Sequence, residues 1–334
     1  MNDSSSFNDA LRFPTPVGGT PLRLDAVPSI IFDVALGLLI PFVLSRLFIP
    51  ARRCSLLLGT CVMVVDRVVL YAFRASQSYN IGPRQSVNIL IYQQISFAQG
   101  FLGILHDLVG HLRVLLVQAT NPPYLIDSIH QTDTDFGDVK LDMPRTRHWV
   151  RRICDLLVLV FFAATIPTFY QGALFHGAVD GDQSKADSIM TIRYLHTGIA
   201  TFILFSLGAI TVWGYLSLPD IRRDACVRIL TVLAILLPIP VYRFIVMHFT
   251  IPNLLSAAPG SQESPGAKAA FYVFHCLPEF FACALLVIPN TRKVFCSGPY
   301  GDWRSSDETK SCSGAMAEAR EKEAEKKRRN GQRV

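Results

Sequence analysis

The feature of this sequence that most constrains its fold is a series of seven long apolar runs separated by short polar segments. An α-helix needs about 20 residues to cross roughly 30 Å of hydrocarbon, and each run is close to that length or longer. No run alternates with the period of two that a barrel strand shows. We therefore predict an all-α polytopic membrane protein, a bundle of seven transmembrane helices. The predicted spans are 28–48, 54–73, 87–117, 153–171, 189–216, 227–249 and 269–288.

The composition supports this class. Half of the 334 residues are hydrophobic and 17% are charged, whereas soluble domains carry about 25% charged residues. The net charge of +6 comes from residues between the apolar runs and near the C-terminus, which suits an anionic membrane surface. We therefore expect the lipid bilayer as a partner, in the plasma membrane or an endomembrane, and no nucleic acid.

The distribution of lysine and arginine predicts the orientation, because positive residues are retained in cytosolic loops. The loops expected in the cytosol hold the larger group, which is Arg46, Arg52, Arg53, Lys140, Arg145, Arg147, Arg151, Arg152, Arg222, Arg223 and Arg228. The opposite loops hold Arg74, Arg84, Lys185 and Lys268. We predict an outside N-terminus and a cytosolic C-terminus. The expected segments are a disordered extracellular N-terminus (1–27), a helical domain (28–288) and a cytosolic juxtamembrane segment with a charged tail (289–334).

The N-terminal segment and the cysteines bear on processing. Residues 1–27 are polar and proline-rich and lack the apolar core of a cleavable signal peptide, so the first run is expected to be an uncleaved signal-anchor. No disulfide is expected, because every cysteine falls in an apolar run or on the predicted cytosolic side. The cysteines are Cys54, Cys61, Cys154, Cys226, Cys276, Cys283, Cys296 and Cys312.

Eight polar side chains fall at similar depth in the predicted spans, in the outer half of the membrane or near its midplane. They are Asp33, Asp66, Arg67, Gln94, His196, Arg243, His275 and Glu279. Charges inside a bilayer cost several kcal/mol each and normally face one another or water. The set predicts a polar cavity open to the outside, filled by water or a ligand. The alternatives are paired ions that fix helix packing, with Glu279 and Arg243 as the pair to test, and interfacial snorkelling.

Other local features carry weaker hypotheses. Snorkelling is the default expectation for Arg193 and His248, which lie near the outer interface. Asp107 and His111 share a helix face, as a hydrogen-bonded pair or as a metal or proton-relay site. Lys268 begins the last span, which excludes a retinal Schiff base deep in that helix. We expect no cofactor, no metal and no catalytic residue, and an enzymatic role is disfavoured.

Cys296 follows the last span beside two basic residues. Juxtamembrane cysteines of this kind are candidates for S-acylation. A free cytosolic thiol is the alternative.

Several strings carry a resemblance to known proteins. These are 271–279 (FYVFHCLPE), 290–292 (NTR), 298–304 (GPYGDWR), Asp66 with Arg67, 73–76 (FRAS), 92–94 (YQQ) and 97–100 (FAQG). Together they resemble uncharacterised seven-transmembrane membrane proteins of fungi. The seventh span is more distantly similar to the fungal lipid-translocating exporter-like family. The resemblance implies a seven-helix fold with an outside N-terminus.

Two classes of function follow. One is a receptor-like or sensing protein, in which a small molecule or lipid in the outward-facing polar cavity acts on a cytosolic protein partner. The alternative is a transporter or lipid-translocating exporter-like protein that opens the same cavity to each side in turn. The proline break at Pro238 and Pro240 and the proline at Pro278 suit both classes, because both need helices that bend.

Overall fold

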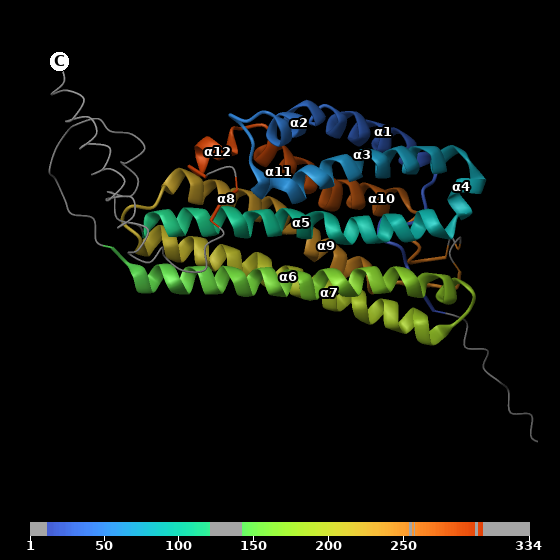
Figure 1. Cartoon of the computed structure of the whole chain (residues 1–334). Coiled ribbons are helices and arrows are strands. Elements are labelled where there is room, and N and C mark those ends of the chain that lie inside the picture. Colours follow the sequence, from blue (N-terminus) through green and yellow to red (C-terminus); the bar gives the residue numbers. More distant parts are fainter. Residues whose placement is uncertain (1–11, 121–141, 254–255, 257, 298–299, 303–334) are drawn as a thin grey trace, which may run out of the picture.

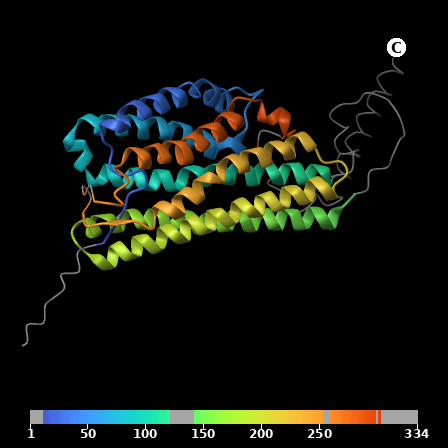
Figure 2. The same cartoon turned by 180° about the vertical axis from the view of Figure 1, so that it is seen from behind.

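The computed structural model describes residues 12–120, 142–253, 256, 258–297 and 300–302. This part of the chain forms a bundle of seven helical spans that are long and apolar enough to cross a membrane (Figures 1 and 2). The prediction of an all-α polytopic bundle is confirmed at this level. The spans are Arg23–Phe48, Ser55–Tyr79, Val87–Ala119, Pro144–Val179, Gln183–Ser217, Arg223–Val246 and Pro265–Val287.

Several spans consist of more than one helical element. Span 1 comprises α1 (Arg23–Gly37) and α2 (Ile40–Phe48), and span 2 comprises η1 (Ser55–Leu57) and α3 (Leu58–Tyr79), followed by α4 (Ile81–Gln85). Spans 3, 4 and 5 are α5 (Val87–Ala119), α6 (Pro144–Val179) and α7 (Gln183–Ser217). Span 6 comprises α8 (Arg223–Leu236) and α9 (Pro238–Val246). Span 7 comprises α10 (Pro265–Phe271), the π-helix η3 (Tyr272–Cys276) and α11 (Leu277–Val287), followed by α12 (Thr291–Val294).

Proline explains where three spans change element. Proline has no amide hydrogen and its ring collides with the carbonyl four residues earlier, which favours a break or kink in a helix, although Pro28 and Pro167 lie within α1 and α6 (Pro144–Val179). Pro41 lies in the first turn of α2, Pro238 begins α9, and Pro278 lies in the first turn of α11. The break at Pro238 and Pro240 that the sequence predicts is therefore present. At Pro278 the irregularity takes the form of the π-helix that precedes it.

Helix α5 lies at the centre of the bundle (Figures 1 and 2). It packs against α3, α6, α7, α8 and α11, and 78% of the apolar window in this span is buried. Its buried positions include the small residues Ala98 and Gly100. Small residues let neighbouring helices approach closely inside a membrane bundle. This central position brings α5 beside the polar residues of five other spans.

One end of the bundle, here called the sheet end, carries a short antiparallel pairing of β1 (Phe13–Pro14) with β2 (Thr250–Ile251). Residues 12–22, here called the cap segment, cross this end. The Phe13 ring packs edge-on against Phe175 with centroids 6.0 Å apart, and the Val17 amide donates to Gln94 Oε1 at 3.0 Å. Residues 12–27 therefore differ from the disordered N-terminus that the sequence suggests, because the segment carries apolar side chains that the bundle buries.

Glycine allows the cap segment to turn against span 7. Gly18 and Gly19 have φ angles of 76° and 58°, in the left-handed region that favours glycine. A Cβ on Gly18 would lie 2.8 Å from ring atoms of Phe271, so a larger residue would also collide with the helix. The turn presents backbone carbonyls of the cap segment to the interior.

The opposite end, here called the basic end, carries α12 and the arginine-rich helix termini. Arg46 on α2 is buried and donates to the carbonyl oxygens of Val287, Ile288 and Pro289 at 3.0, 2.9 and 2.6 Å. These carbonyls lie at the C-terminal end of span 7, where acceptors are otherwise unpaired and a cation is favoured. Arg46 therefore fastens span 1 to the end of span 7.

Candidate functional site

A buried ion pair between spans 2 and 7 forms the centre of the polar core. Arg67 on α3 donates from Nε to Glu279 Oε2 at 2.8 Å and from Nη2 to Glu279 Oε1 at 2.9 Å. Arg67 is 1% exposed and Glu279 is 2% exposed. Two parallel hydrogen bonds match the planar guanidinium to the carboxylate, which is the strong form of this interaction. The pair ties α3 to α11 in the interior of the bundle.

Span 3 completes this arrangement around Arg67. Arg67 Nη1 donates to Asp66 Oδ2 at 3.0 Å and to Ser96 Oγ at 2.6 Å. Ser96 Oγ in turn donates to Asp66 Oδ2. The Tyr92 hydroxyl donates to Asp66 Oδ1 at 2.7 Å. Asp66 therefore binds Arg67, its neighbour in sequence, as well as Ser96 and Tyr92 of span 3. Arg67 has two carboxylate partners.

Arg243 on α9 joins the core through neutral groups. It donates from Nη1 to the Phe97 carbonyl oxygen at 2.9 Å and from Nε to Thr197 Oγ1 at 3.2 Å. The alternative prediction of an ion pair between Glu279 and Arg243 is therefore wrong, because Glu279 binds Arg67 instead. His275 lies one turn before Glu279, and its Nδ1 is 3.8 Å from Glu279 Oε1.

Gly100 on α5 makes room for this core. A Cβ there would lie 2.8 Å from Arg67 Cζ and 3.1 Å from Glu279 Oε1, and it would overlap Arg67 Nη2. We expect Gly100→Ala to displace the guanidinium and lower the free energy of unfolding by about 1–3 kcal/mol, the usual cost of overpacking. Thermal unfolding in detergent measures this effect.

Gly198→Ala on α7 is the matched control, because a Cβ at Gly198 meets nothing within 4 Å. Its melting temperature should stay at the wild-type value or rise slightly, because alanine is a better helix former than glycine. Equal melting temperatures for the two alanine variants would contradict the close approach of α5 to Arg67.

The structure brings six of the eight predicted polar residues into this core or its edge, namely Asp66, Arg67, His196, Arg243, His275 and Glu279. Gln94 lies nearer the sheet end and binds the cap segment through Val17. Asp33 lies half-buried on α1, and no hydrogen bond reaches its buried Oδ1 within the described part of the chain. Among these eight, only Asp33 and Asp66 keep substantial exposure. In place of the expected open cavity there is a closed polar core beneath the cap segment, because Arg67, His196, Arg243, His275 and Glu279 are each at most 2% exposed.

A second ion cluster lies between the polar core and the sheet end, and sequence reasoning missed it. Asp25 on α1 binds Arg74 Nη2 at 3.0 Å and Lys268 Nζ at 2.8 Å, and it accepts from the Tyr272 hydroxyl at 2.9 Å. Arg74 and Lys268 also donate to the Gly18 carbonyl oxygen. All of these side chains are buried. A signal was present in the sequence, since Asp25 stands three residues before the first predicted span.

Arg193 on α7 does not lie where the sequence predicts it. It does not snorkel to the interface but lies 1% exposed on the inward face of its helix, together with His196 and Ala200. Neither Arg193 Nη1 nor Nη2 has a hydrogen-bond partner within the described part of the chain. Both ring nitrogens of His196 and the hydroxyl of Tyr242 also have no hydrogen-bond partner within the described residues. His248 is exposed.

Asp107 and His111 contribute to the basic end of the bundle. The Asp107 carboxylate accepts from the Thr60 amide at 2.6 Å and from the Gly59 amide at 3.2 Å, so it caps the first turn of α3. His111 Nδ1 contacts the Asp107 carbonyl oxygen at 2.7 Å, not the carboxylate. In the ranges that the structure describes, no three His, Cys, Asp or Glu side chains gather as metal ligands would.

Cys296 is exposed beyond the last span, and its Sγ lies 2.6 Å from Arg222 Nη1. The other described cysteines are free and buried, and Cys312 lies outside the described residues. We expect acyl-exchange labelling to detect S-acylation in the wild type and to lose most of that signal in Cys296→Ser. Cys283→Ser, at a buried position, is the control and should keep the signal. Equal labelling of the wild type and Cys296→Ser would contradict acylation at this position.

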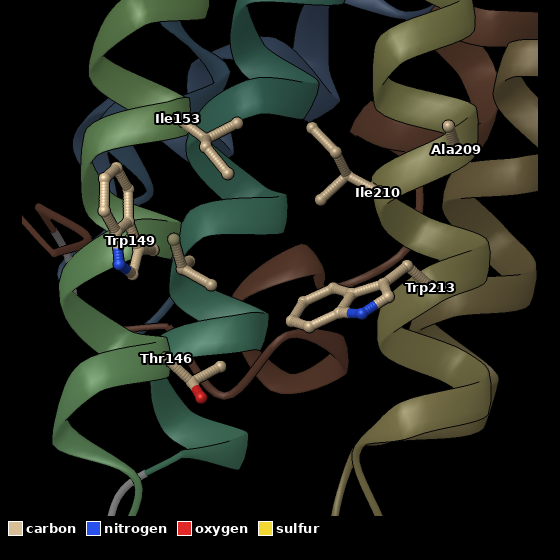
Figure 3. Close-up of a pocket in the computed structure, with 7 residues that line it drawn as sticks. Thr146, Trp149, Ile153, Ala209, Ile210 and Trp213 are labelled. Atoms are coloured by element: carbon tan, nitrogen blue, oxygen red, sulfur yellow. The ribbon is translucent and has the colours of Figure 1, made fainter.

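Two apolar grooves face outward from the bundle. The first, of about 460 Å³, lies between α6 and α7 near the basic end. Figure 3 shows Trp149 and Trp213 on either side of it, with Ile153 and Ile210 further along. Tryptophan is enriched where hydrocarbon meets water, so this level of the bundle suits a membrane interface. The second groove, of about 530 Å³, lies between span 6 and span 7 and reaches from Ala234 to Phe249 and Gln262.

A comparison of the chain with family models, curated proteins and solved structures finds no match.

Proposed function

We propose that this protein is a receptor-like membrane protein that senses a ligand through its polar core and transmits the change to its basic end. The N-terminus lies outside and the C-terminus in the cytosol, in the plasma membrane or an endomembrane. The ligand is a small molecule or lipid, and a cytosolic protein is the partner of the basic end. Three features of the bundle support this proposal.

The observation that carries the proposal is an apolar layer between the polar core and the basic end. Asp107 also lies at this level of α5, where it is buried and caps the first turn of α3. On spans 2, 3, 5, 6 and 7, nine apolar positions that follow the core are at most 1% exposed. They are Val64, Leu105, Leu108, Ile203, Leu207, Val232, Leu236, Cys283 and Leu286. Such packing resists an aqueous pathway, since close-packed interiors leave few voids large enough for water. A layer of this kind favours transmission of a conformational change over passage of a polar substrate.

The helices beside the core are irregular, which supports movement there. Span 6 breaks at Leu237 between α8 and α9, and span 7 contains the π-helix η3 directly before Glu279. Kinks and π-helical turns are places where a helix can change direction, and they occur often at functional sites. A ligand that shifts α9 or η3 would also shift the Arg67–Glu279 pair.

Span 7 also connects the core to the basic end. Arg46 donates to the carbonyls of Ile288 and Pro289, which follow α11, and Arg222 donates to the Lys293 carbonyl on α12 at 3.1 Å. A rotation of α11 would therefore move α12, where basic side chains are available to a cytosolic partner. This chain of contacts is a single physical route from the core to that surface.

The orientation leads to a separate prediction. We expect an epitope tag before Met1 to be reachable by antibody on intact cells and a tag after Val334 to require permeabilisation, because the arginine-rich loops at the basic end favour the cytosol. If the protein resides in an endomembrane, protease protection of sealed vesicles replaces the surface assay. Finding both tags on one side of the membrane would contradict an odd number of spans.

The coupling can be tested without a known ligand. A fluorophore attached to Cys296 after hydroxylamine has cleaved the acyl thioester, in a Cys312→Ser background, reports on the basic end, and Gly100→Ala disturbs Arg67 in the core. Sensing predicts that Gly100→Ala changes the emission of the fluorophore and that Gly198→Ala does not. An unchanged spectrum in Gly100→Ala would overturn the proposed coupling.

Lipid translocation is the alternative, and the grooves that open toward lipid favour it. Reconstituted vesicles containing a fluorescent phospholipid distinguish the two functions. A translocator lets an external reductant bleach the inner-leaflet label within minutes, whereas a sensor leaves that fraction protected. Fast bleaching, with Gly100→Ala reducing the rate, would replace sensing by lipid translocation.

A further inference from the structure

The buried charges of the sheet-end half do not balance. The cations are Arg67, Arg74, Lys268, Arg193 and Arg243. Asp25 forms salt bridges with Arg74 and Lys268. Asp66 and Glu279 both form salt bridges with Arg67. No salt bridge reaches the last two arginines within the described residues, although Arg243 lies within longer electrostatic range of Glu279. Two buried arginines are thus left without a bound carboxylate.

These two arginines lie in one region of the bundle. Arg243 Nε on α9 donates to Thr197 Oγ1 on α7 at 3.2 Å, and Thr197 lies one helical turn after Arg193 among the buried residues of α7. His196 lies beside Arg243 and touches Phe101, with ring centroids 6.3 Å apart. An unpaired buried charge costs several kcal/mol, and a second like charge nearby raises that cost. The arrangement is one that an anionic group would relieve.

The groove between spans 6 and 7 reaches the same region. Tyr242 lines it and is 6% exposed, and the rest of its wall is almost wholly hydrocarbon, including Val241, Ala270 and Phe274. Its volume of about 530 Å³ falls within the range of small-molecule sites. A molecule in this groove has lipid-like surroundings along its length and meets Tyr242, the residue before Arg243, on its wall.

We propose that Arg193 and Arg243 bind the acid group of an anionic amphiphile, a carboxylate or phosphate monoester, whose hydrocarbon chain occupies the groove between spans 6 and 7. His196 and the Tyr242 hydroxyl donate to the same acid group. The Nη atoms of Arg193 have almost no accessible surface, so the acid enters when α9 moves about the break at Leu237. The inference rests on the proposed function, because this amphiphile is the ligand sensed.

Binding is measured with radiolabelled oleate on the purified full chain in a non-ionic detergent. Two competitors separate the contributions of the hydrocarbon chain and the charge. Oleyl alcohol has the chain without the charge, and inorganic phosphate has the charge without the chain. We expect unlabelled oleate to displace the label, and neither competitor to do so at the same concentration. Displacement by oleyl alcohol would overturn the role of the arginines, and displacement by phosphate alone would overturn the role of the groove.

Variants test the two halves of the site. Arg193→Gln should weaken oleate binding about tenfold to hundredfold, the worth of a charge-assisted hydrogen bond, while Arg23→Gln, exposed at the same end, should not. Ala270→Phe fills the groove and should abolish binding, while Ala269→Phe on the exposed neighbouring position should not. Wild-type affinity in Arg193→Gln or Ala270→Phe would overturn the proposal.

Unfolding separates a binding role for Arg193 from a structural one. An unpaired buried cation destabilises the ligand-free protein, so Arg193→Gln should raise its melting temperature while lowering its affinity for oleate. A lowered melting temperature would mean that Arg193 supports the fold and would overturn the proposal. The Cys296 fluorophore then distinguishes the failure of one proposal from the failure of the other. Oleate binding without a change in emission would support the binding site and overturn the proposed sensing function.

Discussion

Glu279→Met is expected to lower the free energy of unfolding by about 3–5 kcal/mol, because it strands Arg67 in the interior of the bundle. Arginine cannot escape the cost by losing its proton, and Asp66 alone then balances it. A loss of this size is a large part of the total stability of a typical domain. Full-length fluorescent fusions run by size exclusion in detergent should show aggregation in place of a monodisperse peak.

The double variant Arg67→Met with Glu279→Met distinguishes the reason for that loss. Replacing both partners of a buried ion pair by apolar residues is often nearly neutral, so the double variant should recover a monodisperse peak. Arg52→Met, at an exposed position, is the matched control for an arginine substitution and should behave as the wild type. A double variant as poorly folded as Glu279→Met would mean that the pair does not act as a unit.

The positions of the spans could be predicted from the sequence because length and hydropathy report directly on the bilayer. Proline 238 likewise marks the break between α8 and α9, since the chemistry of proline is local. The helices nevertheless run past the apolar runs; α6, for example, spans Pro144–Val179, against a predicted 153–171. Polar residues continue a helix without contributing to the hydropathy signal.

The pairing inside the core could not be predicted in the same way. Sequence gives the depth of a side chain in its helix, but the partner depends on how each helix is rotated and how the helices cross. Arg67 and Arg243 lie at similar depth, and only the packing of α3 against α11 brings Arg67 to Glu279. The same limit applies to Arg193, whose inward direction follows from the face that α7 turns toward the bundle.

The second ion cluster, around Asp25, and the cap segment could not be predicted for a different reason. The proline-rich composition of residues 1–27 indicates disorder when read locally, yet residues 12–22 pack on the bundle through contacts distant in sequence. Gly18, for example, accepts from Lys268, which lies 250 residues away. Only the folded bundle supplies the donors that these carbonyls need.

Asp25→Asn is the second substitution with a large expected effect, because one carboxylate balances two buried cations. Asp25 is 0% exposed, and its loss leaves Arg74 and Lys268 without any bound carboxylate within the described residues. We expect a loss of about 3–5 kcal/mol, as for other broken buried ion pairs. Lys268→Met should cost less, since Arg74 and Asp25 then remain as a one-to-one pair.

A second measurement ties this loss to the cap segment. Arg74 and Lys268 hold the Gly18 carbonyl oxygen, and Lys268 also holds that of Thr20 at 2.6 Å. With Asp25→Asn these cations repel each other, so the cap segment should loosen and trypsin should cut after the exposed Arg23 faster than in the wild type. Arg84→Met, near the same end, is the control and should leave the rate unchanged. If Lys268→Met destabilises the protein as much as Asp25→Asn does, Asp25 is not the balancing charge of the cluster, and the cap is instead held by the lysine itself.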